Sequence, residues 1–211
     1  MKRKSSIVRA STDHYKKSSK KFPLSGQVIL LIVLVLLLII VAFFADDIHK
    51  EATEGAYPQT YSMYVTKYAE KYNVPQYMIY AVIRTESKFD SNAVSGVGAV
   101  GLMQLMPETY GWIKDTLRDN EKESDERIFD PEVNIRYGTY YLSYLYERFE
   151  NWETAYAGYN AGPTIVSKWL KDPNYSADGE TLHTIPYGET ADYVVKVAAA
   201  KERYEKEFAE S

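Results

Sequence analysis

Apolar side chains recur at helical spacing along most of the chain after residue 60. Between residues 61 and 72 they return every three or four positions, which predicts an amphipathic helix. The same pattern predicts further helices over 75–87, 107–117, 131–149, 152–159, 164–170 and 191–208. Proline stands at or directly before the start of four of them, where its missing N–H costs nothing. No alternating run is long enough to predict a strand, so we expect a mainly α-helical domain without repeats.

An unbroken apolar run covers residues 28–45, 18 residues in all. As a helix it would be about 27 Å long, close to the hydrocarbon thickness of a bilayer. The run exceeds the apolar core of most signal peptides, and Phe43 stands where a cleavage site needs a small residue. We therefore predict an uncleaved transmembrane helix over residues 27–45, and the absence of cysteine excludes a lipoprotein.

Charge is distributed unevenly on the two sides of this run. Residues 1–26 carry eight Lys or Arg and one Asp, a net charge of +7, whereas the whole chain carries −4, so residues 27–211 sum to −11. The positive-inside rule places residues 1–26 in the cytoplasm and the rest outside a single-pass cell membrane protein. Residues 46–59 are interpreted as a tether and residues 60–211 as the globular domain. The acidic domain argues against nucleic-acid binding.

Glu86 is the first candidate for chemistry. The residues three, four and seven positions before it are Ile83, Val82 and Ile79, so it lies on the apolar stripe of its own helix. A carboxyl group there is costly to ionise, and we expect a raised pKa, as in a general acid. A single glutamate in such a place is more often a structural residue, so the other motifs decide between the two interpretations.

A glycine-rich loop follows this helix. Gly96, Gly98 and Gly101 stand within six residues, which indicates a tight turn or a backbone that a ligand can approach closely. Residues 102–107 then place one amide, Gln104, among apolar side chains. The middle helix opens with Asp130 as a predicted N-cap, and Gly138 inside it predicts a close helix contact.

Four segments stand in one order: Glu86 and Ser87 closing a helix, residues 98–107, residues 159–163 and residues 189–194. Together they resemble the lytic transglycosylase domain of the soluble-lytic-transglycosylase type, a lysozyme-like domain of the α+β superfamily. The likeness covers roughly residues 60–205 and includes Asn134 and Gly138. One departure is Gly158, where the family usually has alanine; we expect a slight loosening of that helix.

The resemblance implies cleavage of the β-1,4 bond between N-acetylmuramic acid and N-acetylglucosamine in the glycan strands of peptidoglycan. It makes Glu86 the catalytic acid and residues 60–211 the catalytic domain, with no metal or cofactor. The resemblance also implies a set of substrate-binding residues: Ser95, Gln104, Met106, Tyr159, Asn160, Glu189 and Tyr193. On side-chain chemistry, Tyr159 could donate to Glu86, and Gln104 and Asn160 could bind N-acetyl amides.

Ordinary glycoside hydrolysis uses two carboxyl groups. In the mechanism that the resemblance implies, Glu86 alone acts as acid and then base, and the sugar's own C6 hydroxyl closes a 1,6-anhydro ring. A muramidase-type hydrolase is the alternative enzyme, with Asp90, Glu108 or Glu189 as the second carboxylate. A wall-binding scaffold of an envelope-spanning machine, with protein partners of that assembly, is the alternative outside enzymes.

Overall fold

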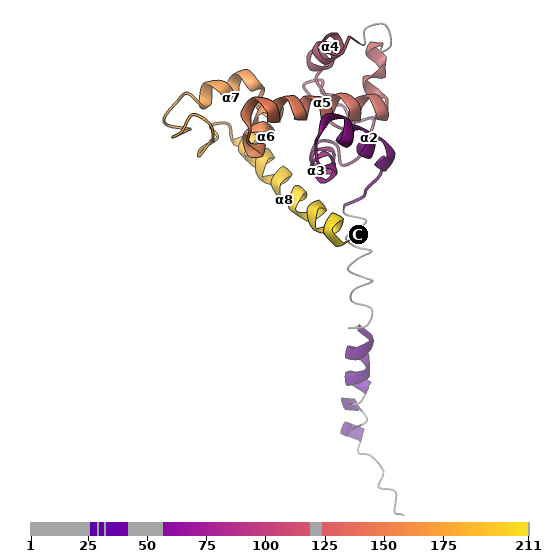
Figure 1. The fold of residues 1–211 in the computed structure, drawn as a ribbon. Helices are drawn as coiled ribbons and strands as arrows, with labels where there is room; N and C mark the ends of the chain where they lie inside the picture. The colour runs from indigo at the N-terminus through magenta and orange to yellow at the C-terminus, as the bar shows by residue number, and fades with distance from the viewer. Residues whose placement is uncertain (1–25, 29, 32, 42–56, 119–123, 211) are drawn as a thin grey trace, which may run out of the picture. The chain divides into compact units, whose positions relative to one another are not determined.

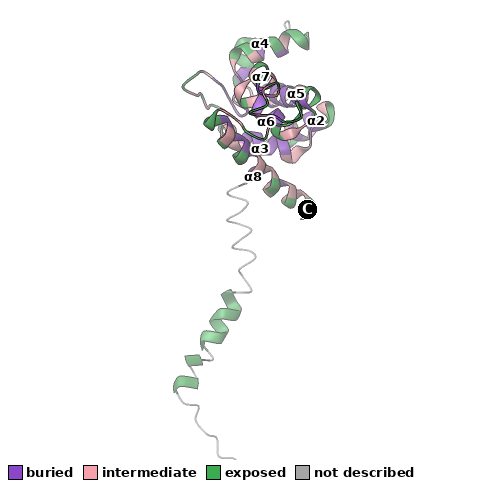
Figure 2. Ribbon diagram, turned by 90° about the vertical axis from the view of Figure 1, so that its left-hand side faces the viewer, coloured by how far each residue is buried: buried purple, intermediate pink, exposed green. Residues whose placement is uncertain are grey.

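The computed structural model describes residues 26–28, 30–31, 33–41, 57–118 and 124–210, in two compact units, Met1–Thr53 and Glu54–Ser211. In the first unit the described residues are helical and their side chains are exposed (Figure 2). No helix formed by the described residues combines the length and the apolarity needed to cross a membrane. Of the predicted transmembrane segment, residues 29, 32 and 42–45 lie outside the described residues, as do residues 1–25 and 46–56.

The described residues of the second unit are mainly helical, as the sequence predicts. In chain order its elements are α2 (Ser62–Tyr72), α3 (Gln76–Glu86), α4 (Pro107–Thr116), the 3-10 helix η1 (Asp125–Phe129), α5 (Pro131–Phe149), α6 (Trp152–Ala161), α7 (Pro163–Trp169) and α8 (Gly188–Glu210). The described residues form no strand, only two isolated bridges, between Val94 and Val100 and between Val100 and Leu105. The mainly α class is confirmed, and these bridges shape the loop that follows α3.

The predicted helices match the observed ones closely, with two differences. Helix α8 begins at Gly188, three residues before the predicted start. The apolar pattern predicts no helix over residues 125–129, where the structure has the 3-10 helix η1. Asp130 caps α5 as predicted: its Oδ1 accepts from the Glu132 and Val133 amides at 2.9 and 3.2 Å.

Helix α5 is the central element of the domain. It packs against α2, α6, η1 and α4, while α3 lies along α8 (Figure 1). Ile135, Tyr137, Leu142 and Leu145 of α5 are fully buried in this core. Figure 2 shows the buried residues gathered where α3, α5 and α6 meet. Burial of this apolar surface is the main stabilisation of the domain, and it fixes the end of α3 against the loop that follows.

Two glycines allow the close packing around α5. A Cβ on Gly138 would lie 2.4 Å from the Met103 Sδ atom, so the contact is close as predicted, but it is made with the loop after α3 and not with another helix. A Cβ on Gly158 of α6 would lie 2.9 Å from Phe149 Cε2. The Phe149 ring takes up the space that a side chain at position 158 would need, and the slight loosening expected at Gly158 stays a prediction.

Candidate active site

Glu86 is the last residue of α3, whose preceding turns are anchored in the core by Ile79, Val82 and Ile83. The next residue, Ser87, donates its hydroxyl proton to the Leu102 carbonyl oxygen at 2.8 Å. This bond ties the end of the helix to the loop that carries Met103 and Gln104. The backbone then turns sharply away, with Lys88 and Phe89 both at positive φ. Glu86 is thus held at a fixed helix end beside the glycine-rich loop.

The Glu86 carboxyl group has the raised pKa that its sequence position predicts. The residue keeps partial exposure to solvent, but its carboxyl group is packed among neighbours, and this burial raises the pKa from 4.5 to about 7. Hydrogen bonding with Tyr193 opposes the shift, because it favours the charged form. A carboxyl group with a pKa near 7 can both give and take a proton near neutral pH.

Two tyrosine hydroxyls lie near Glu86, one from α8 and one from α6. Burial is the main cause that raises the pKa of both Tyr193 and Tyr159, and the charge of Glu86 raises both further. Both therefore stay neutral at physiological pH. The Tyr193 hydroxyl is buried without a well-formed hydrogen bond among the described residues, so its interaction with Glu86 is long or poorly aligned here. From this position the Tyr193 hydroxyl can donate a hydrogen bond to Glu86 when the carboxyl group becomes charged.

The Tyr159 hydroxyl does not donate to Glu86, contrary to our expectation. It donates instead to the Met103 carbonyl oxygen at 2.9 Å. A phenol has one proton to give, so this bond excludes a simultaneous donation to the carboxyl group. The Tyr159 ring also packs on Tyr141 of α5, with ring centroids 5.3 Å apart. Tyr159 therefore joins α6, α5 and the loop beside the acid.

Asn134 of α5 fixes the loop between α3 and α4 through hydrogen bonds. Its side chain is fully buried; Nδ2 donates to the carbonyl oxygens of Val100 and Ile128, and Oδ1 accepts from the Met103 amide, all at 2.8–2.9 Å. Gly101 packs against this side chain with its backbone at φ 79°. A Cβ on Gly101 would lie 2.4 Å from Asn134 Nδ2. The pair explains why a glycine is required at position 101.

Gln104 points back into the loop rather than presenting its amide N–H groups to a ligand. Nε2 donates to the carbonyl oxygens of Ala93 and Gly101 at 3.1 and 3.0 Å. Its backbone takes the left-handed conformation, φ 46°, which is uncommon for a residue with a side chain. The Oε1 atom has no hydrogen-bond partner among the described residues. Gln104 can therefore still accept from an N-acetyl N–H, but it cannot donate without opening the loop.

Ser95 lies within the loop between α3 and α4, and Met106 is the last residue of that loop. The Ser95 hydroxyl oxygen accepts from the Ala99 amide at 2.9 Å, which closes a tight turn through Gly98 at φ 89°. Its proton remains available to a ligand. Met106 is the N-cap residue of α4 and is half-buried. Both predicted residues thus belong to the loop and its exit into α4.

Asn160 and Glu189 stand on the α6 and α8 side of the candidate site. The Asn160 Oδ1 atom accepts from the Thr190 hydroxyl at 2.7 Å, and this bond joins the end of α6 to the start of α8. Asn160 itself is exposed. Glu189, in the first turn of α8, is also exposed. Thr190 was not predicted as a site residue, although it lies within the last of the four family segments.

None of the three carboxylates considered as a second catalytic group is a cause of the shifted pKa of Glu86. Asp90, Glu108 and Glu189 are exposed, and none contributes to the shifted pKa of Glu86, whose causes are burial and Tyr193. Within the described part of the chain, no group of three or more His, Cys, Asp or Glu could hold a metal ion. The structure therefore offers one desolvated carboxyl group flanked by two neutral phenols.

Comparison with known proteins matches this arrangement to one family. The model of the transglycosylase SLT domain matches residues 63–181, more than half of the chain. The soluble lytic murein transglycosylase of Escherichia coli K12 is 36% identical over 148 residues, which cover 69% of this chain and 23% of that protein. Membrane-bound lytic murein transglycosylase C of Yersinia enterocolitica is 34% identical over 165 residues, 67% of this chain and 46% of that protein.

Solved structures give the same result. The lytic transglycosylase Slt of Pseudomonas aeruginosa aligns with a TM-score of 0.64 at 36% identity, over 72% of this chain and 25% of that one. The 70-kDa soluble lytic transglycosylase of E. coli aligns with a TM-score of 0.65 at 32% identity, over 74% and 25%. The chain spans less than half the length of each of these relatives. It belongs to the transglycosylase SLT domain family.

Proposed function

We propose that this protein is a peptidoglycan lytic transglycosylase, which cleaves the β-1,4 bond between N-acetylmuramic acid and N-acetylglucosamine without using water. The observation that carries the proposal is the buried Glu86 carboxyl group, which has a pKa of about 7 and lies near the hydroxyls of Tyr193 and Tyr159. A hydrolase of the two-carboxylate type would need a partner across the site. The names of the relatives support the same activity.

The reaction needs only one protein carboxyl group, used twice. Glu86 gives its proton to the glycosidic oxygen as the bond from that oxygen to C1 of muramic acid breaks. The substrate's N-acetyl group stabilises the cation that develops at C1. The Glu86 carboxylate then takes the proton of the C6 hydroxyl, whose oxygen attacks C1 and closes the 1,6-anhydro ring. Glu86 ends protonated again, so atoms and charge balance without water.

The neighbouring groups support these two half-reactions. Burial keeps Glu86 protonated near neutral pH, ready for the first transfer. The buried Tyr193 hydroxyl has no well-formed partner among the described residues, so it is available to donate to Glu86 once the carboxylate forms. The Tyr159–Met103 and Asn134–Met103 bonds hold the loop beside the acid in one position. These contacts supply the preorganisation that proton transfer requires.

The experiment is a digest of purified peptidoglycan with the full chain, followed by mass spectrometry of the released muropeptides. We expect products with 1,6-anhydro-muramic acid ends, each one water lighter than a hydrolysis product. Reducing muramic acid ends would show a muramidase instead. The Glu86→Gln variant should release neither product. Full lytic activity of that variant would rule out Glu86 as the acid, and an inactive wild type would favour the scaffold interpretation.

We further propose that residues 28–45 anchor the protein in the cell membrane, with residues 1–26 in the cytoplasm and residues 60–211 outside. The apolar run and the +7 charge before it support this topology. Cell fractionation with alkaline carbonate extraction tests it: the full chain should stay in the membrane pellet, and a variant lacking residues 1–45 should not. Protease added outside should digest residues 60–211 and spare a tag on the N-terminus; the reverse result would contradict the topology.

A further inference from the structure

A pocket with no part in the proposed reaction lies at the other end of α3 from Glu86. It has a volume of about 460 Å³ and is formed by the end of α2, the turn into α3, the last turn of α5 and the start of α6. Its walls include Glu70, Asn73, Val74, Gln76, Tyr146 and Trp152. We call it the Trp152 pocket. Gln76 is the first residue of α3 and Glu86 is the last, so about 15 Å of helix rise separates the pocket from the acid.

The aromatic wall of the pocket is flat and held in place. Tyr146 and Trp152 stack with ring centroids 4.1 Å apart and an interplanar angle of 16°. Trp152 is the first residue of α6, and its ring also packs on Tyr156, which is buried in the core, at 6.1 Å. Tyr146 is exposed and Trp152 is half-buried. The stack thus has a rigid backing and a face that a ligand can reach, and it suits a ligand with an apolar face of its own.

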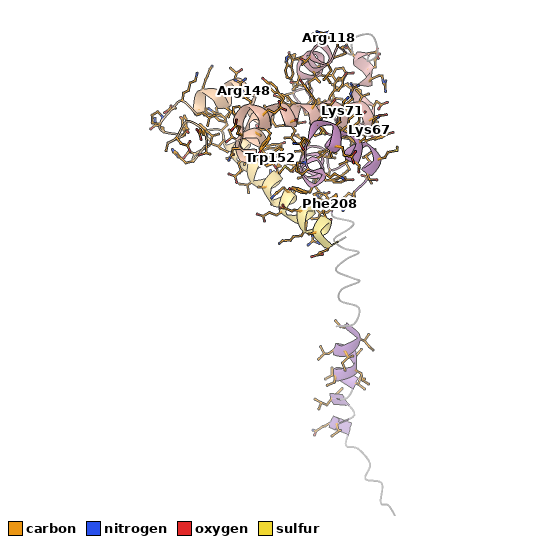
Figure 3. All side chains as sticks on the ribbon, in the orientation of Figure 1. Lys67, Lys71, Arg118, Arg148, Trp152 and Phe208 are labelled. Carbon is orange, nitrogen blue, oxygen red and sulfur yellow. The ribbon has the colours of Figure 1, made fainter. Side chains whose placement is uncertain are left out.

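Polar side chains with free hydrogen-bonding groups border this wall. The Gln76 Oε1 atom accepts from the Thr66 hydroxyl at 3.1 Å, which orients the amide, and the Nε2 group has no partner among the described residues. Glu70 is exposed, and within the described part of the chain its carboxylate forms neither an ion pair nor a hydrogen bond. The Nζ atom of the next residue, Lys71 (Figure 3), lies over the Tyr72 ring, 5.2 Å from its centroid. The pocket therefore keeps one free acceptor and one oriented donor.

This lining favours a neutral ligand that both donates and accepts hydrogen bonds. Among the residues that line the pocket, Glu70 alone carries a charge, and its negative sign repels a phosphate or a carboxylate. An ammonium group could lie over the rings beside Glu70, but it offers no acceptor to the amide donors of Gln76 and Asn73. A pyranose ring with an N-acetyl group suits the whole lining, because its C–H face is apolar and its hydroxyl and amide groups donate and accept.

We propose that the Trp152 pocket is a second glycan-binding site, separate from the one at Glu86. A neutral N-acetylated hexose of a glycan strand lies against the aromatic stack, donates a hydrogen bond to the Glu70 carboxylate and accepts one from Gln76 Nε2. The inference rests on the proposed function only in naming peptidoglycan as the source of that strand. Because two sites of one domain then engage the same wall, the second contact forms at a high effective concentration. The pocket thus holds the protein on the intact wall without entering the reaction.

The binding test uses the full-length Glu86→Gln protein in detergent, so that a sugar probe is bound but not cleaved. The probe is chitotetraose with all four N-acetyl groups, and NMR follows the backbone amide signals of Asn73, Gln76 and Ser95. We expect saturable shifts at Asn73 and Gln76 from the pocket, and an independent set at Ser95 from the loop beside residue 86. If Asn73 and Gln76 do not shift at millimolar probe, whether or not Ser95 responds, the proposal is overturned.

Tyr146→Ala tests the stacking contact, because Tyr146 is exposed and its loss empties no part of the core. In the same protein it should weaken binding at the pocket about tenfold and leave the Ser95 shifts unchanged. Tyr146→Phe keeps the ring and should bind as before. Phe129→Ala removes an exposed ring from η1, outside the pocket, and is the matched control that should change nothing. Unchanged binding in Tyr146→Ala would contradict the proposal.

Tetramethylammonium chloride tests the alternative occupant. Saturable shifts of the Asn73 and Gln76 signals with this salt, and none with chitotetraose, would show that the pocket takes ammonium groups and not sugars. We expect the opposite pattern, because the amide donors that border the rings need an acceptor on the ligand.

The activity test compares wild type with Tyr146→Ala on two substrates, insoluble peptidoglycan and short soluble glycan strands. On the insoluble wall the variant should show a KM about tenfold higher at unchanged kcat, because it loses the second point of attachment. On the short strands, which fill one site at a time, it should match wild type. The same loss on both substrates, or no loss on the wall, would overturn the proposal.

Failure of the pocket proposal and failure of the proposed function give different results. If wild type releases anhydro-muropeptides but the probe leaves Asn73 and Gln76 unshifted, the Trp152 pocket is not a glycan site and the proposed function stands. If the probe binds at the pocket but wild type releases no anhydro-muropeptides, the proposed function fails and the pocket remains a glycan-binding site.

Discussion

The side-chain oxygen of Asn134 accepts a hydrogen bond from the backbone amide of Met103, 31 residues earlier in the chain, at 2.8 Å. Through this bond the central helix α5 fixes the loop that lies beside Glu86, the proposed catalytic acid. The Met103 carbonyl oxygen on the same residue accepts from Tyr159 of α6. One residue of the loop is thus fixed from two helices, and the position of the loop beside Glu86 depends on both.

Replacing Asn134 with alanine should lower the free energy of unfolding by at least about 3 kcal/mol. The change leaves the carbonyl oxygens of Val100 and Ile128 and the Met103 amide without their partners, and each unsatisfied buried group costs roughly 1–3 kcal/mol. Chemical denaturation measures the effect. Asn151→Ala is the control: it removes one helix cap, to the Thr154 amide, and should cost about 1 kcal/mol. Similar losses in both variants would contradict this role of Asn134.

Two glycines in helices should respond in opposite directions to alanine. Gly138→Ala places a Cβ against the buried Met103 side chain and should destabilise the fold by about 1–3 kcal/mol despite the better helix propensity of alanine. At Gly111, on α4, no atom lies within 4 Å of the position that a Cβ would take, so Gly111→Ala should stabilise by about 0.5–1 kcal/mol. Thermal unfolding of both variants measures the contrast. A stabilised Gly138→Ala variant would show that Met103 moves aside freely.

The rate of peptidoglycan cleavage should decline above about pH 7. Glu86 must be protonated to act as the acid, and burial raises its pKa to about 7. Above that value kcat/KM should fall about tenfold for each pH unit, because the protonated fraction falls by that factor. The pH dependence of kcat/KM on soluble glycan strands measures this limb. A limb centred near pH 4.5, the ordinary value for a glutamate, would show that Glu86 is not desolvated in solution.

Removing the Tyr193 hydroxyl should move this limb to higher pH. Hydrogen bonding with Tyr193 lowers the pKa of Glu86, so Tyr193→Phe leaves burial unopposed and the pKa rises. The maximal rate should also fall, since the variant has no phenol to stabilise the Glu86 carboxylate. The same pH series on the variant measures both effects. Tyr156→Phe is the control, because the Tyr156 hydroxyl is also buried without a partner among the described residues but does not shift Glu86.

Glu86→Gln should make the folded protein more stable at alkaline pH. Because the pKa of Glu86 is higher in the folded state than the ordinary 4.5, its contribution to stability is complete below about pH 4.5 and is lost as the pH rises through 7. The variant should therefore exceed wild type by about 1–3 kcal/mol at pH 8. It should not exceed wild type through this effect below pH 4.5.

Thermal unfolding at pH 4 and pH 8 measures the difference between the two proteins. Glu189→Gln, at an exposed position on α8, should change the stability little at either pH. A Glu86→Gln variant with the same advantage at both pH values would mean that the gain does not come from relieving a buried charge.

Much of the fold follows from local patterns. Apolar spacing predicts every α-helix of the second unit within a few residues, and Asp130 followed by Pro131 marks the start of α5 correctly, because caps and periodicity depend on neighbours in the chain. The start of α8 and the short helix η1 were missed. Both are set by how the chain turns into the next packed element, a long-range effect that spacing does not record.

The sequence alone identifies Glu86 as a carboxyl group on the apolar stripe of its helix and predicts its raised pKa. It also gives the order of the four family segments along the chain. Only the folded domain decides where the hydroxyl and amide protons go: Tyr159 to the Met103 carbonyl, Gln104 back into its own loop and Thr190 to Asn160. Desolvation follows from the side chains that share a helix face, which local sequence records. A hydrogen bond follows from the directions of two groups brought together from distant segments, and those directions exist only once the helices have packed.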